Sequence, residues 1–185
     1  MAKVYDGIDD RLRELLLAQP VFFVATAPSG SGGHVNCSPK GGSGCFAVLD
    51  EHRVAYLDYT GSGAETIAHL RDNGRIVVMF CAFDGPPKIV RLHGRGTCVT
   101  PDDPRFAELE RAFAVEPGSG LRSIIDVEVE RVSDSCGFQV PLMAYTGDRT
   151  LLADWAGRKD QAELAEYRAT RNAASIDGLP ALTIG

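Results

Sequence analysis

Hydrophobic residues recur mainly at every second position along the chain, which is the spacing of a β-strand with one buried face. Strand-like segments are found at residues 21–26, 34–38, 54–59, 76–83, 89–100 and 124–132. The segment 76–83 is apolar without interruption, and we expect it to be buried on both faces. The first two segments should pair as a hairpin across the Gly-rich loop 27–33.

Helical spacing predicts four further elements, at residues 9–19, 64–73, 104–115 and 150–173, the last with a break at Gly157. Gly74 should end the second helix in the left-handed conformation. We expect a loop at 39–44 and an extended tail from Asp177. Alternating strands with few helices predict a mainly β (α+β) antiparallel barrel or sandwich with peripheral helices, and argue against a parallel doubly wound sheet.

Length and charge narrow the possible roles. The 185 residues suffice for one domain with its own core. Nineteen Lys and Arg stand against 25 Asp and Glu, and no dense basic run is present, so we expect no nucleic-acid partner. No apolar run approaches the roughly 20 residues that cross a bilayer, and the N-terminus lacks a signal-peptide pattern. These features predict a cytoplasmic protein without membrane contact, in which any anionic ligand needs local positive charge.

The five cysteines are dispersed and include no CxxC pair, which predicts reduced thiols. His34 and Cys37 have a spacing that metal ligands can show. On a strand, however, residues three apart face opposite sides of the sheet. We therefore expect no metal site.

A first candidate site lies at residues 58–66, where a strand leads through a Gly-rich turn into a helix. Backbone N–H groups and the positive end of a helix make such a turn suited to anions. The turn and helix start offer Thr60, Gly61, Ser62, Gly63 and Thr66 as ligands. Ser62 and Glu65 also have the spacing of a capping box, in which both side chains serve the helix itself. The local sequence leaves both interpretations open.

A second candidate site is the segment from His34 to Lys40. His34, Asn36 and Ser38 would share one strand face, and such a polar face suits a strand that lines a polar ligand. Pro39 and Lys40 follow, and Lys40 could supply a point charge to a phosphate. The alternative is an exposed edge strand with a solvated lysine.

The nearest approach to a basic patch is formed by Arg91, His93 and Arg95, which should face one way. They are either a solvent face paired with Glu128 and Glu130, or they flank an anionic ligand. The sequence contains no G-x-S-x-G elbow, no Walker A loop and no G-x-G-x-x-G opening a helix after the first strand. Trp155 and Tyr167 are expected to be packing residues.

The order of these segments resembles a known family. The resemblance covers residues 20 to about 100 and is carried by 23–26, 34–41, 54–63, 70–76 and 90–96. Together they resemble the pyridoxamine 5′-phosphate oxidase-like family of FMN-binding split-barrel proteins. Residues 136–141 and 172–182 are similar to a bacterial branch known as predicted flavin-nucleotide-binding proteins.

This resemblance implies one FMN-binding domain over residues 1–185, an antiparallel Greek-key split barrel, and a homodimer with FMN at the subunit interface. It implies that Lys40 reaches the phosphate, and that Tyr59 and Thr60 lie near the phosphate and ribityl chain. The full candidate set for the cofactor is His34, Asn36, Ser38, Pro39, Lys40, Tyr59, Thr60, Gly61, Ser62, Gly63, Thr66 and Arg91.

The chain also departs from the family enzyme. Glu65 and Thr66 stand where the oxidase has a basic pair for the phosphate, and Ile89 stands where it has a flavin-contacting glutamine. The C-terminal substrate signature of the oxidase is not recognisable. The resemblance therefore implies a flavin-dependent oxidoreductase of unknown substrate rather than a true pyridoxamine oxidase, with His34 and Arg91 as candidates for substrate contact. The alternatives are a non-catalytic flavin carrier or sensor and a deazaflavin-dependent reductase.

Overall fold

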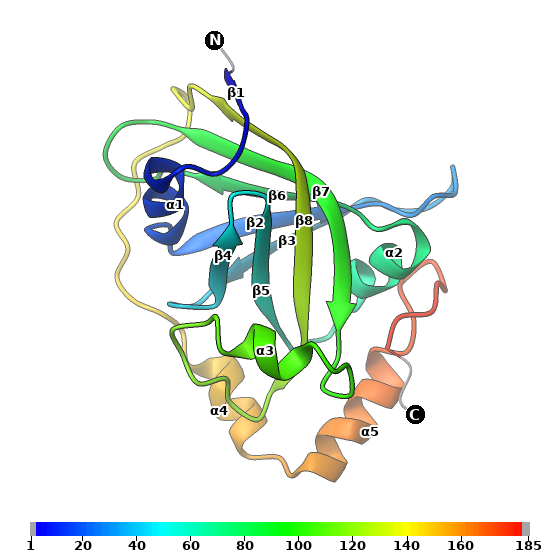
Figure 1. Cartoon of the computed structure of the whole chain (residues 1–185). Coiled ribbons are helices and arrows are strands. Elements are labelled where there is room, and N and C mark those ends of the chain that lie inside the picture. Colours follow the sequence, from blue (N-terminus) through cyan, green and yellow to red (C-terminus); the bar gives the residue numbers. More distant parts are fainter. Residues whose placement is uncertain (1–2, 183–185) are drawn as a thin grey trace.

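The computed structural model describes residues 3–182, and eight β-strands within this range form one antiparallel sheet. Along the sheet the strands follow the order β3-β2-β6-β7-β8-β5-β4, and β1 pairs with the end of β8 (Figure 1). The bounds are β1 Lys3–Tyr5, β2 Val21–Thr26, β3 Asn36–Gly41, β4 Phe46–Asp50, β5 Arg53–Tyr59, β6 Arg75–Cys81, β7 Ile89–Val99 and β8 Leu121–Ser135.

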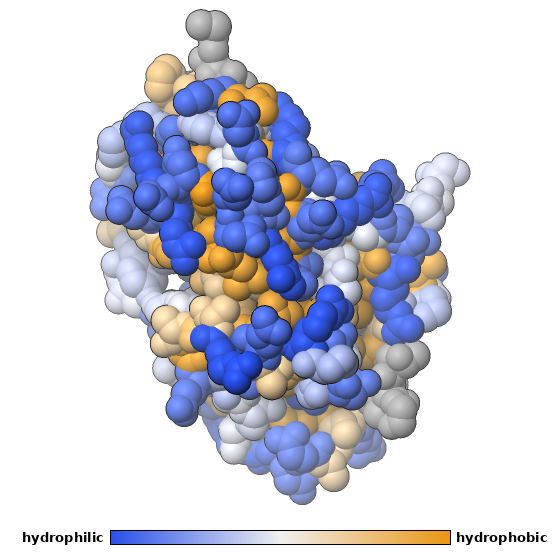
Figure 2. All heavy atoms as spheres, viewed as in Figure 1, coloured by the Kyte–Doolittle hydropathy of each residue, from blue (hydrophilic) through white to orange (hydrophobic). Residues whose placement is uncertain are grey.

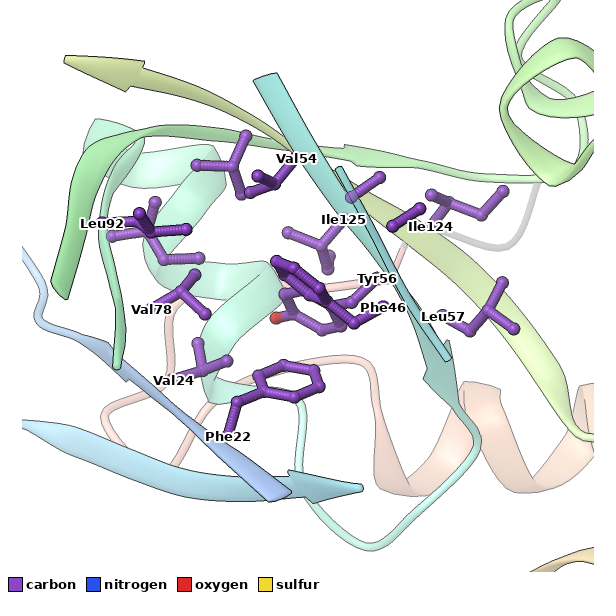
Figure 3. Packing of buried hydrophobic residues seen from close by; sticks show 14 of the residues in the cluster. Phe22, Val24, Phe46, Val54, Tyr56, Leu57, Val78, Leu92, Ile124 and Ile125 are labelled. Atoms are coloured by element: carbon purple, nitrogen blue, oxygen red, sulfur yellow. The ribbon is translucent and has the colours of Figure 1, made fainter. Parts of the chain in front are cut away.

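The sheet curls around a core of aromatic and aliphatic side chains (Figure 3). Alternate residues of β2 point inward, and its Phe22 packs 5.2 Å from Phe46 of β4 and 5.4 Å from Tyr56 of β5, between ring centroids. These strands lie at opposite ends of the hydrogen-bonded order, so their contact shows that the sheet folds back upon itself. The predicted mainly β, antiparallel split-barrel fold is confirmed.

Five helices surround the sheet, at α1 Asp10–Leu17, α2 Glu65–Asn73, α3 Phe106–Glu110, α4 Leu151–Gly157 and α5 Gln161–Arg171. Helix α2 packs on β2, β6 and β7, with Ile67 and Leu70 buried as predicted. Gly74 ends it with φ of 72°, which confirms the left-handed stop. None of the helices in residues 3–182 is long and apolar enough to cross a membrane.

The strand at 34–38, the helix at 104–115 and the extended tail were predicted wrongly. The strand predicted at 34–38 runs instead over Asn36–Gly41, so Pro39 and Lys40 belong to β3 and not to a loop. Proline is tolerated there because β3 is an edge strand, paired only with β2. The helix predicted at 104–115 is helical only over Phe106–Glu110. The tail is not simply extended, because Ser175 N–H bonds to the Leu179 carbonyl and folds it into a turn.

Two strands were not predicted, β1 and β4, and β8 is longer at both ends than expected. The outer face of β6 is only half-buried, so the prediction that this strand is buried on both faces was wrong.

Between His93 and Gly94 a β-bulge shifts the register of β7 against β8. Beyond the bulge, Arg95 is exposed and pairs with Glu130, 3.2 Å between Nε and Oε1. For Arg95, the structure thus favours the first of the two alternatives, a solvent-facing residue paired with Glu130.

The chain after β8 runs along the outside of the sheet toward α4, at the other end of the barrel (Figure 1). The predicted break at Gly157 is confirmed, and α4 and α5 pack through Trp155 and Tyr167, whose ring centroids lie 5.0 Å apart. On the face shown in Figure 2, polar side chains cover most of the surface and apolar ones gather in the gaps between them.

Candidate functional site

A cavity of about 410 Å³ opens where the ends of β3 and β5 meet the Gly-rich turn before α2. It contains two groups predicted separately from the sequence, the end of β3 and the turn itself. Its walls are formed by Ser38, Pro39, Lys40, Gly41, Leu57, Tyr59, Gly61, Ser62, Gly63, Ala64, Glu65, Thr66, Arg122 and Leu152. The two segments predicted as separate candidate sites therefore line one cavity.

A buried carboxylate organises the cations of this cavity. Asp58, at the end of β5, is almost completely buried. Its Oδ2 accepts a hydrogen bond of 2.6 Å from Nε of Arg122, and its Oδ1 lies 3.2 Å from Nζ of Lys40. Ser123 Oγ donates to the same carboxylate at 3.1 Å. Lys40 is thus held in place, which contradicts the alternative of a solvated lysine on an edge strand.

Burial alone would raise the pKa of Asp58, but the Lys40 and Arg122 cations outweigh it and hold that pKa below its ordinary value. The carboxylate is therefore ionised, and the three groups carry one excess positive charge. Within the described residues, Nη1 of Arg122 is buried and has no hydrogen-bond partner. Arg122 is a cationic side chain in the cavity wall, and a hydrogen-bond donor without a partner on such a side chain is suited to an anion.

The predicted capping box does not form. Ala64 is the N-cap of α2 and no side chain caps the helix. The Glu65 carboxylate instead folds onto the turn, since a Cβ added to Gly63 would lie 2.4 Å from Glu65 Oε2. The N–H groups at the start of α2 are consequently not satisfied by Ser62, which leaves the turn as the anion-binding alternative.

Asn36 lies behind the cavity wall and connects its parts. Its Nδ2 donates to Thr66 Oγ1 at 3.0 Å and to Thr26 Oγ1 at 3.2 Å, and its Oδ1 accepts from Ser38 Oγ at 2.9 Å. Thr26 in turn bonds to Nδ1 of the buried His69 at 3.0 Å. This network fixes Ser38 and Thr66, which both face the cavity.

Besides Asn36, three further predicted residues lie away from the cavity walls. His34 is exposed, and its Nδ1 lies 2.6 Å from Asp177 Oδ1. Arg91 lies on β7, where Nη1 donates to Ser135 Oγ at 3.1 Å. Thr60 is fully buried, and its hydroxyl accepts a hydrogen bond of 2.9 Å from Nε of Arg168. The structure thus separates His34 and Arg91 from the remaining candidates and places Thr60 beneath the turn.

Two arginines near the site were missed from the sequence. Arg122 precedes the strand predicted at 124–132. In the structure β8 begins at Leu121, and Arg122 lies at a register shift between the Asp58–Ser123 and Tyr59–Leu121 pairs. Arg168 lies on α5, more than 100 residues from Thr60. No local pattern marks either residue, because their importance arises from pairing between distant segments.

Two further cavities adjoin the first. One, of about 520 Å³, is lined mainly by small and apolar residues and shares Gly41, Tyr59 and Leu152 with the first. The other, of about 830 Å³, shares Lys40 and lies against the outer side of β2 and β3. The cavity that Lys40 and Arg122 line therefore adjoins larger, mainly apolar space, which is the layout of many cofactor sites.

Comparisons with known proteins agree with this fold. The family described as pyridoxamine 5′-phosphate oxidase matches residues 8–136. A pyridoxamine 5′-phosphate oxidase family protein, ustO of Aspergillus flavus, is 43% identical over 192 residues, covering 96% of this chain and 77% of its own. A FAD binding protein from Mycobacterium smegmatis has a similar structure, with a TM-score of 0.50 at 15% identity over 72% of this chain and 96% of the other. The chain belongs to the pyridoxamine 5′-phosphate oxidase family.

Proposed function

We propose that this protein binds FMN in the cavity between β3, β5 and the Gly-rich turn, and that it is a flavin-dependent oxidoreductase. The observation that carries the proposal is the cavity itself, whose walls bring Lys40 and Arg122, with its unpaired Nη1, together with the start of α2, which no side chain caps. These donors suit a phosphate group. Family membership and the fold shared with a FAD binding protein support a flavin as the ligand.

The remainder of the flavin would occupy the adjoining apolar space. Tyr59 borders two of the cavities, and burial raises the pKa of its hydroxyl, so it stays protonated and can donate a hydrogen bond. A bound flavin supplies the redox chemistry, and the protein supplies orientation and electrostatics. No group of three or more His, Cys, Asp and Glu side chains that could hold a metal ion is found in residues 3–182.

We further propose that the site is completed in a homodimer. The outer face of the sheet carries half-buried apolar side chains, among them Val21 and Phe23 on β2 and Val77 and Met79 on β6. The 830 Å³ cavity opens on the same side of β2. A second copy would cover this apolar surface and enclose the cavity.

The first experiment identifies the ligand. The purified protein is examined by visible absorbance, and whatever is released on denaturation is identified by mass spectrometry. We expect an oxidised-flavin spectrum and the mass of FMN, together with the size of a dimer in light scattering. A colourless protein that takes up none of FMN, FAD and riboflavin would overturn the proposal, and uptake of a deazaflavin alone would favour the deazaflavin-dependent reductase.

A second experiment separates an enzyme from a carrier. The flavin-loaded protein is mixed with NADH or NADPH without oxygen, and flavin bleaching is followed. Fast bleaching that recovers on addition of an electron acceptor supports the oxidoreductase. Flavin that is bleached only by light, and that reoxidises only with oxygen, supports the carrier.

A further inference from the structure

The charges around the cavity nearly cancel. Lys40 and Arg122 are its two cationic side chains, and Glu65 is an acidic side chain in its wall. Asp58 bonds to both cations and adds a second negative charge. Since two cations face two carboxylates, the cavity by itself offers no net positive charge to a phosphate.

One more cation lies directly beneath the turn. Arg168 of α5 donates from Nε to the hydroxyl of Thr60 at 2.9 Å and from Nη2 to the carbonyl oxygen of Leu121 at 3.1 Å. Thr60 begins the Gly-rich turn, and Leu121 precedes Arg122. Both acceptors are neutral, and no carboxylate of the described residues lies within 4.0 Å of the Arg168 guanidinium. Its charge is therefore not cancelled locally.

The environment of Arg168 is unfavourable for a positive charge. Partial burial, and to a smaller extent the nearby Arg122 guanidinium, lower the pKa of Arg168 from its ordinary value. Two guanidinium groups that lie close together without a shared carboxylate repel each other. An anion in the cavity would lower this repulsion, because Asp58 compensates the charge of Arg122 but no carboxylate of the described residues compensates that of Arg168.

Helix α5 is anchored to the same turn. Nδ2 of Asn172, the residue after the helix, donates to the carbonyl oxygen of Gly61 at 2.9 Å. Arg71 of α2 donates to the carbonyl oxygen of Ala181, which ties the following tail to the helix that the turn begins. Figure 1 shows the tail that follows α5 beside α2. The family match ends at residue 136, so these contacts come from the chain beyond it.

We propose that α5 completes the phosphate end of the flavin site, and that Arg168, held on Thr60, acts with Arg122 as a source of positive charge for the phosphate. This inference rests on the proposed function. Arg168 is a positioning and charge-supplying residue, because Thr60 lies between it and the cavity. Binding of a phosphate and docking of α5 then stabilise each other.

The test compares FMN with riboflavin, which lacks only the phosphate. Both are titrated into the wild type, Arg168→Gln, Arg168→Lys and Arg171→Gln, with flavin fluorescence as the readout. Arg171 is the matched control, since it is an exposed arginine on the same helix. We expect Arg168→Gln to weaken FMN binding by roughly tenfold and to leave riboflavin binding unchanged, because only the phosphate interacts with the charge that is lost. Arg168→Lys should retain most of the FMN preference, and Arg171→Gln should retain all of it.

Each alternative outcome is distinct. If wild type binds neither flavin, the proposed function fails. If the wild type binds FMN more tightly than riboflavin and Arg168→Gln keeps that preference, the proposed role of α5 is overturned. Equal weakening of FMN and riboflavin binding in Arg168→Gln would also overturn it and would make Arg168 only structural. Loss of preference in Arg168→Lys to the same degree as in Arg168→Gln would also overturn it. If Arg168→Gln fails to fold, limited proteolysis of the wild type decides, because FMN but not riboflavin should slow cleavage between α4 and α5.

Discussion

Nζ of Lys40 lies 3.2 Å from Oδ1 of Asp58, so the lysine at the end of β3 is paired with a buried carboxylate. The same carboxylate bonds to Arg122 on β8. Lys40 thus has two roles in the proposed site. It neutralises Asp58 together with Arg122, and it lines the cavity.

The first prediction concerns Lys40. In Lys40→Met, FMN binding should weaken by about 1–3 kcal/mol, the range for hydrogen bonds to charged groups, while riboflavin binding changes little. Isothermal titration with both flavins measures this difference. Lys3→Met is the control, since Lys3 lies on β1, which pairs with the far end of β8. Unchanged FMN affinity in Lys40→Met would place the phosphate elsewhere.

The second prediction concerns Glu65, whose carboxylate folds onto Gly63 in the cavity wall. In Glu65→Gln the side chain keeps its size and loses its charge, so FMN should bind roughly three- to tenfold more tightly, as expected when one partly exposed like charge is removed. Riboflavin should be unaffected. Glu14→Gln, an exposed change on α1, is the control. Weaker FMN binding in Glu65→Gln would mean that this carboxylate contacts the ligand favourably.

The third prediction concerns Gly94 at the β-bulge. A Cβ there would lie 2.0 Å from the carbonyl oxygen of Glu128, and a backbone atom cannot move aside as a flexible side chain can. Gly94→Ala should therefore lower the free energy of unfolding by about 2–3 kcal/mol, the upper part of the range for overpacking. Gly30→Ala is the control, because nothing lies within 4 Å of the added Cβ. Urea unfolding compares the two, and equal stability would show that the bulge can relax.

The fourth prediction concerns acid stability. Asp134 accepts hydrogen bonds from Lys88 and Tyr5, which lower its pKa from 3.8 to about 2. A lowered folded-state pKa means that the stabilisation is complete above about pH 4 and is lost as the pH falls toward 2. Asp134→Asn should cost about 1–2 kcal/mol at pH 7, after allowance for solvent screening, and almost nothing near pH 2.

Urea unfolding of wild type and Asp134→Asn at pH 7, 4 and 2.5 tests this dependence. Asp6→Asn is the control, since Asp6 is exposed and lies next to Tyr5 in the sequence. A stability difference that stays constant over this pH range would contradict the assignment of the shift to Asp134.

The local chemistry of the site could be predicted because it depends on short segments. Lys40 and the residues of the Gly-rich turn lie near the end of a strand or the start of a helix, and their residue types predict an anion site, whereas Tyr59 was implied only by the family resemblance. The choice between that site and a capping box could not be made from the sequence. It depended on the position of the Glu65 side chain, which the sequence does not specify.

The sequence by itself determined the antiparallel strands and the Gly74 helix stop, because both follow from spacing within one segment. Only the tertiary structure decided which charges meet at the cavity. Arg122 reaches Asp58 across the register of β5 and β8, and Arg168 reaches Thr60 only after the chain has passed around the barrel into α5. Such contacts depend on strand register and helix docking over 60 to 110 residues of separation, where periodicity carries no information.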